Sequence, residues 1–374
     1  MNIFHLNKSF KMKQNIIIYL LVVVLYSCNQ SGNRTTQNNP FNNPGENKNN
    51  NATVLKLIKH ELVDREATGI VASTYLIPAD WRVDENLYWE YRDATVPIRY
   101  KGIIQNNDGT MAVQTFADIR AVWATGPSGT SGYRPPADII AALKSLINDE
   151  RKGKNITFVD QKTISSNQQP ANQQGAPAQL NQTGVIRIEY NENGQTFVEE
   201  FYGQLDAADA VTPSVMGNME SLVWSVSNLY SCKASKEKLD ECRKIAQTIK
   251  SSVRLTLPFY NRLAQVIRLL SDQVYAQIYQ AGQISKIISA TNDQMIANID
   301  ASYRQSQQAS DRINNQFSDY IRGVDRYTDS GNEIQLPSGY DNAWVNDRGE
   351  YLLTNTPGYQ PGNDDGNWKP LQKN

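Results

Sequence analysis

A continuous run of apolar residues near the start of the chain, from Ile16 to Tyr26, most constrains what the remaining sequence can fold into. Lys8, Lys11 and Lys13 precede the run. The run is shorter than the roughly 20 residues that a membrane-spanning helix needs, and its length and basic flank are typical of an export signal. The fold must therefore be sought in the sequence that follows, in a chain that leaves the cytoplasm.

The signal ends at a cysteine. Leu25-Tyr26-Ser27-Cys28 resembles the lipobox of bacterial lipoproteins, in which a small residue precedes the cysteine that becomes the acylated N-terminus. Tyr26 departs from that pattern, because its position usually holds a small or β-branched residue. The resemblance implies that residues 1–27 are a lipoprotein signal peptide and that acyl chains on Cys28 anchor the protein in a membrane. The alternative is an uncleaved signal or a short anchor, with Cys28 a chance residue.

Charge and histidine content exclude several classes of function. With Lys8, Lys11 and Lys13 removed, 34 basic residues face 38 acidic ones, a net charge of −4, which argues against nucleic acid as a partner. His5 leaves with the signal, so His60 is the one histidine of the exported chain. Histidine-based catalytic triads and multi-histidine metal sites are thereby excluded within one chain. We predict no catalytic residue, no metal site and no cofactor.

Two segments are rich in Asn, Gln, Pro and other small or polar residues. The first, residues 28–52, cannot bury enough apolar surface to offset its ordering entropy, so we predict a disordered tether. The second, residues 163–183, is expected to be a disordered loop inside the following domain. The tether lacks an acidic cluster of the kind that directs some lipoproteins to the cell surface, which favours the periplasmic face of the envelope.

Residues 53–255 show alternating strand periodicity and turn signals, such as Asn107-Asp108-Gly109 and Glu192-Asn193-Gly194. Helical periodicity follows in two places, at 137–150 and 236–252. Cys232 ends a predicted strand and Cys242 lies on the apolar face of the second helix. In an exported protein this pair is expected to form a disulfide. Strands are expected at 70–77, 96–104, 111–116, 119–123, 185–190, 196–205 and 222–229.

This order of elements predicts an α+β domain, an antiparallel sheet with flanking helices. The opening strand into Ile77-Pro78-Ala79-Asp80-Trp81 and the closing helix segment 245–252 are similar to the PsbP-like fold. Members of that fold are mostly non-catalytic assembly or binding subunits, so the resemblance implies a binding role. It transfers no site residue.

Residues 256–324 carry an apolar stripe with a mean spacing near 3.6 residues. We predict one long amphipathic helix or a helical hairpin, with Gly282 or residues 291–293 as the break points. A long apolar stripe is stable in water only when it is buried against another apolar surface. We therefore expect a protein partner or self-association through residues 258–324.

The tail, residues 325–374, is expected to form a small β-meander. The run from Ile334 to Tyr340, with Trp344 and Glu350-Tyr351, resembles a C-terminal element of exported bacterial proteins of unknown function. Its aromatic residues could anchor a partner or fill the edges of small sheets. The candidate partner-binding residues are Tyr340, Trp344, Tyr351 and Trp368.

The strongest acidic pair, Glu199 with Glu200, does not predict catalysis. Adjacent residues of a strand point to opposite faces, so the two carboxylates cannot face one substrate, and ordinary solvated charges are expected. We predict a lipid-anchored envelope protein that works as a non-catalytic binding or scaffolding module. The alternative is a carbohydrate-active enzyme or glycan-binding surface lipoprotein, which would need an aromatic platform beside two converging carboxylates.

Overall fold

The computed structural model describes residues 54–91, 96–126, 129–170, 178–214, 217–271, 294–321, 323–362 and 366–374. The predicted signal peptide, the lipidation residue Cys28 and the tether lie outside the described residues, as do residues 272–293 of the predicted long helix. Within the described part of the chain, no helix is long and apolar enough to cross a membrane.

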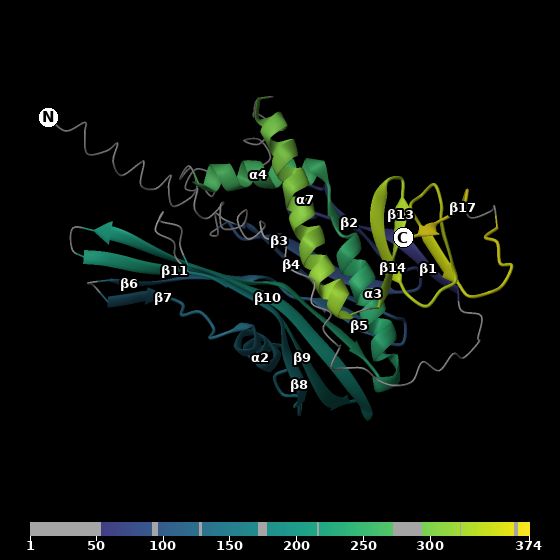
Figure 1. Cartoon of the computed structure of the whole chain (residues 1–374), viewed down its shortest axis with the longest axis horizontal. Coiled ribbons are helices and arrows are strands. Elements are labelled where there is room, and N and C mark those ends of the chain that lie inside the picture. Colours follow the sequence, from purple (N-terminus) through teal and green to yellow (C-terminus); the bar gives the residue numbers. More distant parts are fainter. Residues whose placement is uncertain are drawn as a thin grey trace.

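The predicted α+β class is wrong, because the described chain is mainly strands arranged in antiparallel sheets (Figure 1). The large sheet is curved and contains the longest strands. Its strand order is β3 (Arg82–Trp89), β4 (Ile98–Gln105), β5 (Ala112–Thr115), β11 (Gly217–Ala234), β10 (Gln195–Ser214), β9 (Gln179–Glu192) and β8 (Thr157–Gln169). The other end of β11 pairs with β6 (Ile119–Gly126), which pairs with β7 (Gly129–Gly132).

Part of the unexpected strand content lies in residues 163–183, the segment that was expected to be a disordered loop. Thr163 to Gln169 extends β8 and Gln179 to Thr183 extends β9, and the two strands pair along this polar stretch. Residues 171–177 lie outside the described part. A strand is held by backbone hydrogen bonds, which are available whatever the side chains are. The polar composition of residues 163–183 was therefore a poor guide to their structure.

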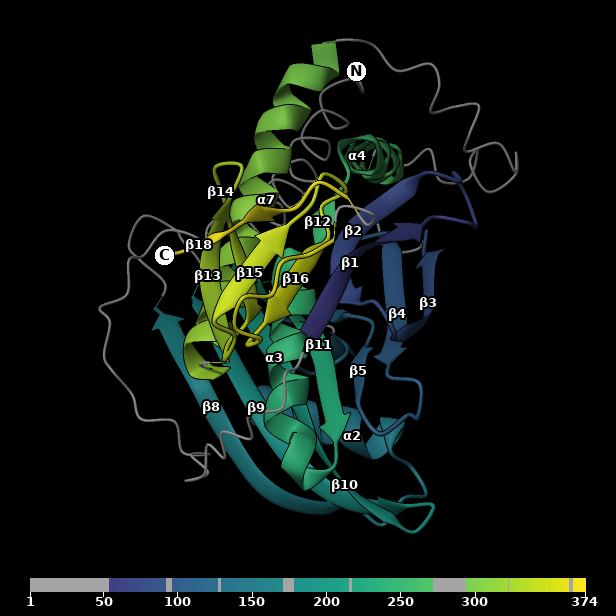
Figure 2. The same ribbon diagram turned by 90° about the vertical axis from the view of Figure 1, so that its right-hand side faces the viewer.

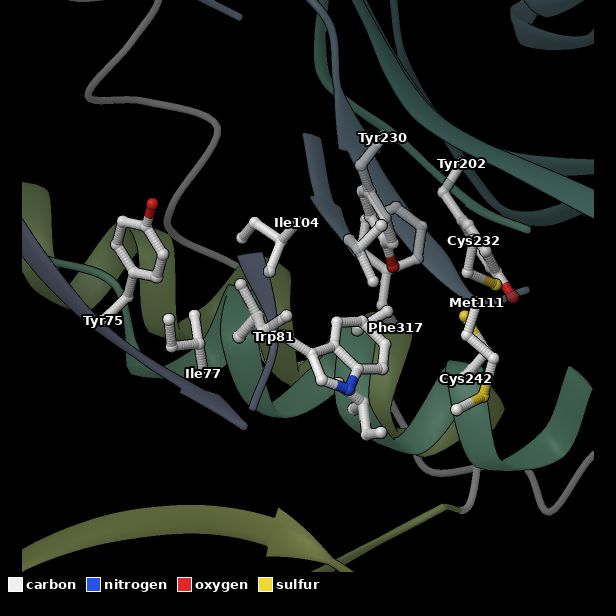
Figure 3. Close-up of a cluster of buried hydrophobic side chains, with 14 of the residues drawn as sticks. Tyr75, Ile77, Trp81, Ile104, Met111, Tyr202, Tyr230, Cys232, Cys242 and Phe317 are labelled. Carbon is white, nitrogen blue, oxygen red and sulfur yellow. The ribbon is translucent and has the colours of Figure 1, made fainter. Parts of the chain in front are cut away.

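The large sheet has a helix layer on each face. Phe197, Phe201 and Leu205 of β10 pack with α2 (Ile139–Glu150). Val198 and Tyr202 point the other way and pack with α3 (Leu239–Ser252). Figure 3 shows this second core, where Phe317 stands edge-on against the stacked rings of Tyr202 and Tyr230. A short 3₁₀ turn, η1 (Lys236–Lys238), leads into α3.

Of the two alternatives predicted for residues 256–324, one long helix or a helical hairpin, the single long helix is wrong. The described residues form two separate helices, α4 (Leu257–Ser271) and α7 (Gln294–Ile321). Tyr260 of α4 and Tyr303 of α7 meet with ring centroids 5.4 Å apart. Phe259 and Phe317, one from each helix, are buried in the core of this same chain. Among the described residues of the apolar stripe, Val266, Leu270 and Phe317 are therefore buried against other parts of the same chain.

The tail does not form a separate β-meander. In the terminal sheet, β16 (Tyr351–Thr354) pairs with β1 (Val54–Val63), so the two ends of the folded chain share one sheet (Figure 2). An edge strand exposes unpaired backbone groups, and β16 supplies the partner that β1 needs. The full order is β12 (Arg254–Leu255), β2 (Val71–Pro78), β1, β16, β15 (Asn342–Val345) and β17 (Lys369–Pro370). A third sheet has the order β14 (Asn332–Pro337), β13 (Val324–Asp329) and β18 (Gln372–Lys373).

Two glycines let α2 approach the sheet closely. Gly184 of β9 and Gly203 of β10 are paired in register beneath the helix. A Cβ on Gly203 would lie 2.9 Å from Leu229 Cδ2 and 3.0 Å from Leu143 Cδ2. A Cβ on Gly184 would lie 2.8 Å from Ile139 Cγ2. The helix can therefore rest on the sheet only because these positions lack side chains.

We expect Gly203→Ala to lower the free energy of unfolding by about 1–3 kcal/mol, because the added methyl group overpacks the α2 interface. Urea denaturation monitored by circular dichroism measures the change. Gly362→Ala is the matched control, since a Cβ there would have no atom within 4 Å. Equal stability of the two variants would contradict this account of the interface.

Candidate binding pocket

Two adjacent glutamates lie at the centre of the large sheet. Glu199 and Glu200 follow each other on β10 and point to opposite faces, as the strand geometry predicts. The expectation that they are solvated is wrong, because each side chain is only 1% exposed. A buried carboxylate needs a cation and hydrogen-bond donors, and each of these has both. The predicted hairpin places Arg187 opposite Glu200, but Arg151 and Arg243 lie more than 40 residues from their glutamates, so the sequence could not show the burial.

On the α2 face, Glu199 accepts four hydrogen bonds from three residues. Arg151, at the end of α2, donates from Nε to Oε2 at 2.9 Å and from Nη2 to Oε1 at 2.5 Å. Tyr190 donates to Oε2 at 2.9 Å and Ser231 donates to Oε1 at 2.6 Å. Burial, together with the Glu199 charge, raises the pKa of Tyr190 above its usual range, which keeps this phenol a proton donor. The carboxylate is therefore fully engaged.

On the opposite face, Glu200 joins α3 to the sheet. Arg243 of α3 donates from Nε at 2.6 Å and from Nη2 at 2.7 Å. Arg187 of β9 lies 2.8 Å away and Tyr202 donates at 2.6 Å. Burial acts to raise the pKa of Glu200, but the bonds and charges of Arg243 and Arg187 outweigh it and lower that pKa. This cluster lies inside the core and joins α3 to the large sheet, so its role is structural.

The α2 face of the sheet carries a cavity of about 190 Å³ just beyond the end of α2. Residues of β4, β5, β11, β10 and β9 line it, Glu199 among them, together with Arg151 from the end of α2. Three further charged residues line it, namely Lys154, Lys233 and Glu192. Glu192 accepts from Lys154 Nζ at 2.7 Å and also from Lys233 Nζ. These bonds lower the pKa of Glu192 to about 2.

Local structure places each of these side chains. Gly153 has a φ of +84°, which turns the chain at the end of α2 and brings Lys154 back over the sheet. Glu192 ends β9 at the Asn193-Gly194 turn, where both residues have positive φ, so the predicted hairpin is confirmed. The ammonium of Lys154 lies over the Tyr190 ring at 4.6 Å, and that of Lys233 over the Phe197 ring at 4.1 Å.

The pocket is lined by charged groups that are paired with one another. Its charges form two sets, Arg151 with Glu199 and, near the rim, two lysines with Glu192. Glu192 is 30% exposed, and a carboxyl with a pKa near 2 is a poor general acid. The sequence analysis did not predict the pocket. Two local signals lie beside its lining residues: Gly153, which precedes Lys154, and the Asn193-Gly194 turn, which follows Glu192.

The predicted cysteine pair is close in space but not bonded. Cys232 and Cys242 are free, buried thiols, where a disulfide was expected (Figure 3). The Cys242 Sγ lies 3.6 Å from the Ala112 carbonyl oxygen and 3.5 Å from that of Lys233. A hydrogen bond between the two thiols and the burial of Cys232 both raise the pKa of the Cys232 thiol. The pair packs as small apolar side chains between α3 and the sheet.

The predicted aromatic set of the tail divides in the structure. Tyr351 is buried in the core of the terminal sheet and donates to Asp329 at 2.7 Å. Tyr340 packs against that core, and Trp344 meets the Tyr359 ring edge-on at 6.0 Å. Trp368 is half-buried. Partner binding by Tyr340, Trp344, Tyr351 and Trp368 stays a prediction, as does self-association through residues 258–324.

His60 belongs to a second polar cluster, between β1 and β3. Its Nε2 lies 2.7 Å from Glu85 Oε1, while Tyr75 and Tyr100 both donate to Glu85 Oε2. Burial acts to raise the pKa of Glu85, but the bonds from His60 and Tyr75 lower it on balance. The lone histidine is therefore held by a carboxylate. Among the described residues, no group of three or more His, Cys, Asp or Glu is placed to hold a metal ion.

Comparison with known proteins gives little to set beside this geometry. No family model and no curated protein matches the chain. The solved structure of LpqN, described as involved in cell envelope biogenesis of Mycobacterium tuberculosis, is similar over 54% of this chain and 91% of its own, with 11% identity and a TM-score of 0.21. The di-domain ARO/CYC StfQ of the steffimycin pathway is similar over 59% of this chain and 87% of its own, with 7% identity and a TM-score of 0.09. Scores this low carry no argument about fold or function.

We expect Glu199→Gln to destabilise the protein by about 3–5 kcal/mol, because it leaves Arg151 buried without its counter-charge. Urea denaturation measures the loss. Glu220→Gln, at an exposed position on β11, is the control. A loss below about 1 kcal/mol would show that Arg151 reaches solvent when Glu199 is absent.

The pH dependence of stability tests the Glu192 site. The folded-state pKa of Glu192 is about 2, below the ordinary value of 4.5, so its stabilising contribution is complete above about pH 4.5 and is lost as pH falls towards 2. The difference in unfolding free energy between the native protein and Glu192→Gln should therefore be constant from pH 7 to 5 and shrink below pH 4.5. Denaturation series at these pH values measure it. A difference independent of pH would contradict the ion pairs.

Proposed function

We propose that this chain is a non-catalytic binding protein of the bacterial envelope, held to a membrane through acyl chains on Cys28. The export signal and its closing cysteine support the location. The pocket between α2 and the β9–β10 turn supports the binding role. The observation that carries the proposal is that both of its carboxylates are held by cations, with Glu199 in a two-bond pair and Glu192 between two lysines.

A carbohydrate-active enzyme is the second candidate, since Glu192 and Glu199 line the same pocket. Glycoside hydrolysis needs one carboxylic acid with a raised pKa to protonate the leaving group. The lysines act on Glu192 in the opposite direction. The rings of Tyr190 and Phe197 are covered by ammonium groups and so give no open platform for a sugar. The geometry therefore favours binding without hydrolysis.

The pocket opens on the α2 face of the large sheet, away from the terminal sheet in which the first described strand, β1, lies. Residues 28–52 would give the folded part a flexible connection to the membrane. We place the protein on the periplasmic side, because the sequence after Cys28 lacks an acidic cluster. In this arrangement the pocket would meet molecules of the envelope space.

We expect Cys28→Ala to abolish incorporation of labelled palmitate and to release the protein from the membrane fraction. Metabolic labelling followed by fractionation measures both effects. Cys232→Ala is the control and should keep the label, because that thiol is buried. Label retained in the Cys28 variant would overturn the anchor.

A further inference from the structure

The rim of the pocket brings two ammonium groups onto one carboxylate. Lys154 comes from the turn after α2, Lys233 from β11 and Glu192 from the end of β9. The three residues come from separate segments, and each lysine is seated on an aromatic ring. The two cations are therefore fixed on either side of one oxyanion position, which Glu192 fills in the present structure.

The charge around the cavity is not balanced. Three cations, Arg151, Lys154 and Lys233, face two carboxylates, Glu192 and Glu199. Arg151 is engaged by Glu199 and by the Gln114 side-chain oxygen, to which it donates at 2.9 Å. A lysine ammonium has three N–H donors, and Glu192 needs only one from each lysine. The rim can therefore donate to a further anion.

We propose that this pocket binds a small oxyanion, a phosphate or carboxylate group of a polar ligand, between Lys154 and Lys233, with Glu192 as the internal group that the ligand displaces. The inference rests on the proposed binding function and names its ligand class. The cavity of about 190 Å³ is smaller than the ~300–1,000 Å³ of pockets for drug-sized ligands, so it admits one charged group with a small body. Gln105 and Gln114 line the same cavity and offer amide groups to that body.

Displacement of Glu192 by the ligand predicts the direction in which a Glu192 substitution changes oxyanion affinity, which an ordinary surface ion pair would not. Glu192 is 30% exposed, so its side chain can swing out to solvent. Removing its charge leaves both lysines without their internal anion and removes a like charge beside the ligand. Glu192→Gln should therefore bind an oxyanion more tightly than the native protein, although it deletes a pocket residue.

Titration of the purified, ¹⁵N-labelled full chain with inorganic phosphate tests the proposal, with sodium lactate as the carboxylate arm and chloride at matched ionic strength as the blank. The amide signals of Gly153, Lys154 and Gly194 should shift saturably with phosphate, lactate or both, and the tighter arm identifies the ligand group. Glu192→Gln should lower the dissociation constant about fivefold. Lys154→Met and Lys233→Met should each raise it by at least a similar factor.

Lys152→Met is the matched control, because Lys152 lies two residues before Lys154, is exposed and does not line the pocket. Its dissociation constant should equal that of the native protein. The absence of saturable shifts in both the native protein and Glu192→Gln would overturn the proposal, and so would equal or weaker binding by Glu192→Gln. The palmitate labelling is independent of this titration, so failure of the ligand class and failure of the anchor are distinguishable.

Discussion

Two buried arginine–glutamate clusters on opposite faces of β10 hold the helices of this protein on its central sheet. Glu199 binds Arg151 at the end of α2, and Glu200 binds Arg243 of α3. Replacing Glu199 alone would leave Arg151 buried without its counter-charge, which costs more than the pair contributes. The clusters therefore restrict which helix can lie on which face and how far along it sits. Their physical effect is to fix position more than to add stability.

The pocket depends on one of these clusters, that of Arg151 and Glu199. Arg151 is bound to Glu199, so α2 ends above the middle of the sheet and leaves the rest of that face uncovered. The chain turns at Gly153, and Lys154 comes to lie opposite Lys233 and Glu192. The ion pair of Arg151 and Glu199 therefore joins α2 to the sheet and also contributes two of the charges that line the pocket.

The chain is closed by the pairing of its two ends. The opening strand β1 lies between β2 and β16, and the tail strands complete the sheet on which α3 packs. This closure buries Leu57 and Leu353 together, although almost three hundred residues separate them. The apolar faces of α4 and α7 are used in the same way, against the core of their own chain.

The sequence by itself determined the local structure. Polar–apolar alternation and the Asn107-Asp108-Gly109 and Asn193-Gly194 turns located most strands of the large sheet, and helical spacing located α2 and α3. The opposite directions of Glu199 and Glu200 also followed from strand geometry alone, because side chains alternate along any strand. These features depend on residues that are close in the chain, so their causes can be read there.

The tertiary structure decided what depends on distant residues. The burial of Glu199 and Glu200 needs Arg151 and Arg243, which no local pattern connects to them. Three features were missed for the same reason: the pairing of β16 with β1, the strand character of the polar β8, and the free thiols of Cys232 and Cys242. The binding pocket belongs to this group, since Lys154, Glu192 and Lys233 meet only when three segments are brought together by the sheet. Spacing along a chain specifies faces and turns, whereas a site of this kind is specified by packing.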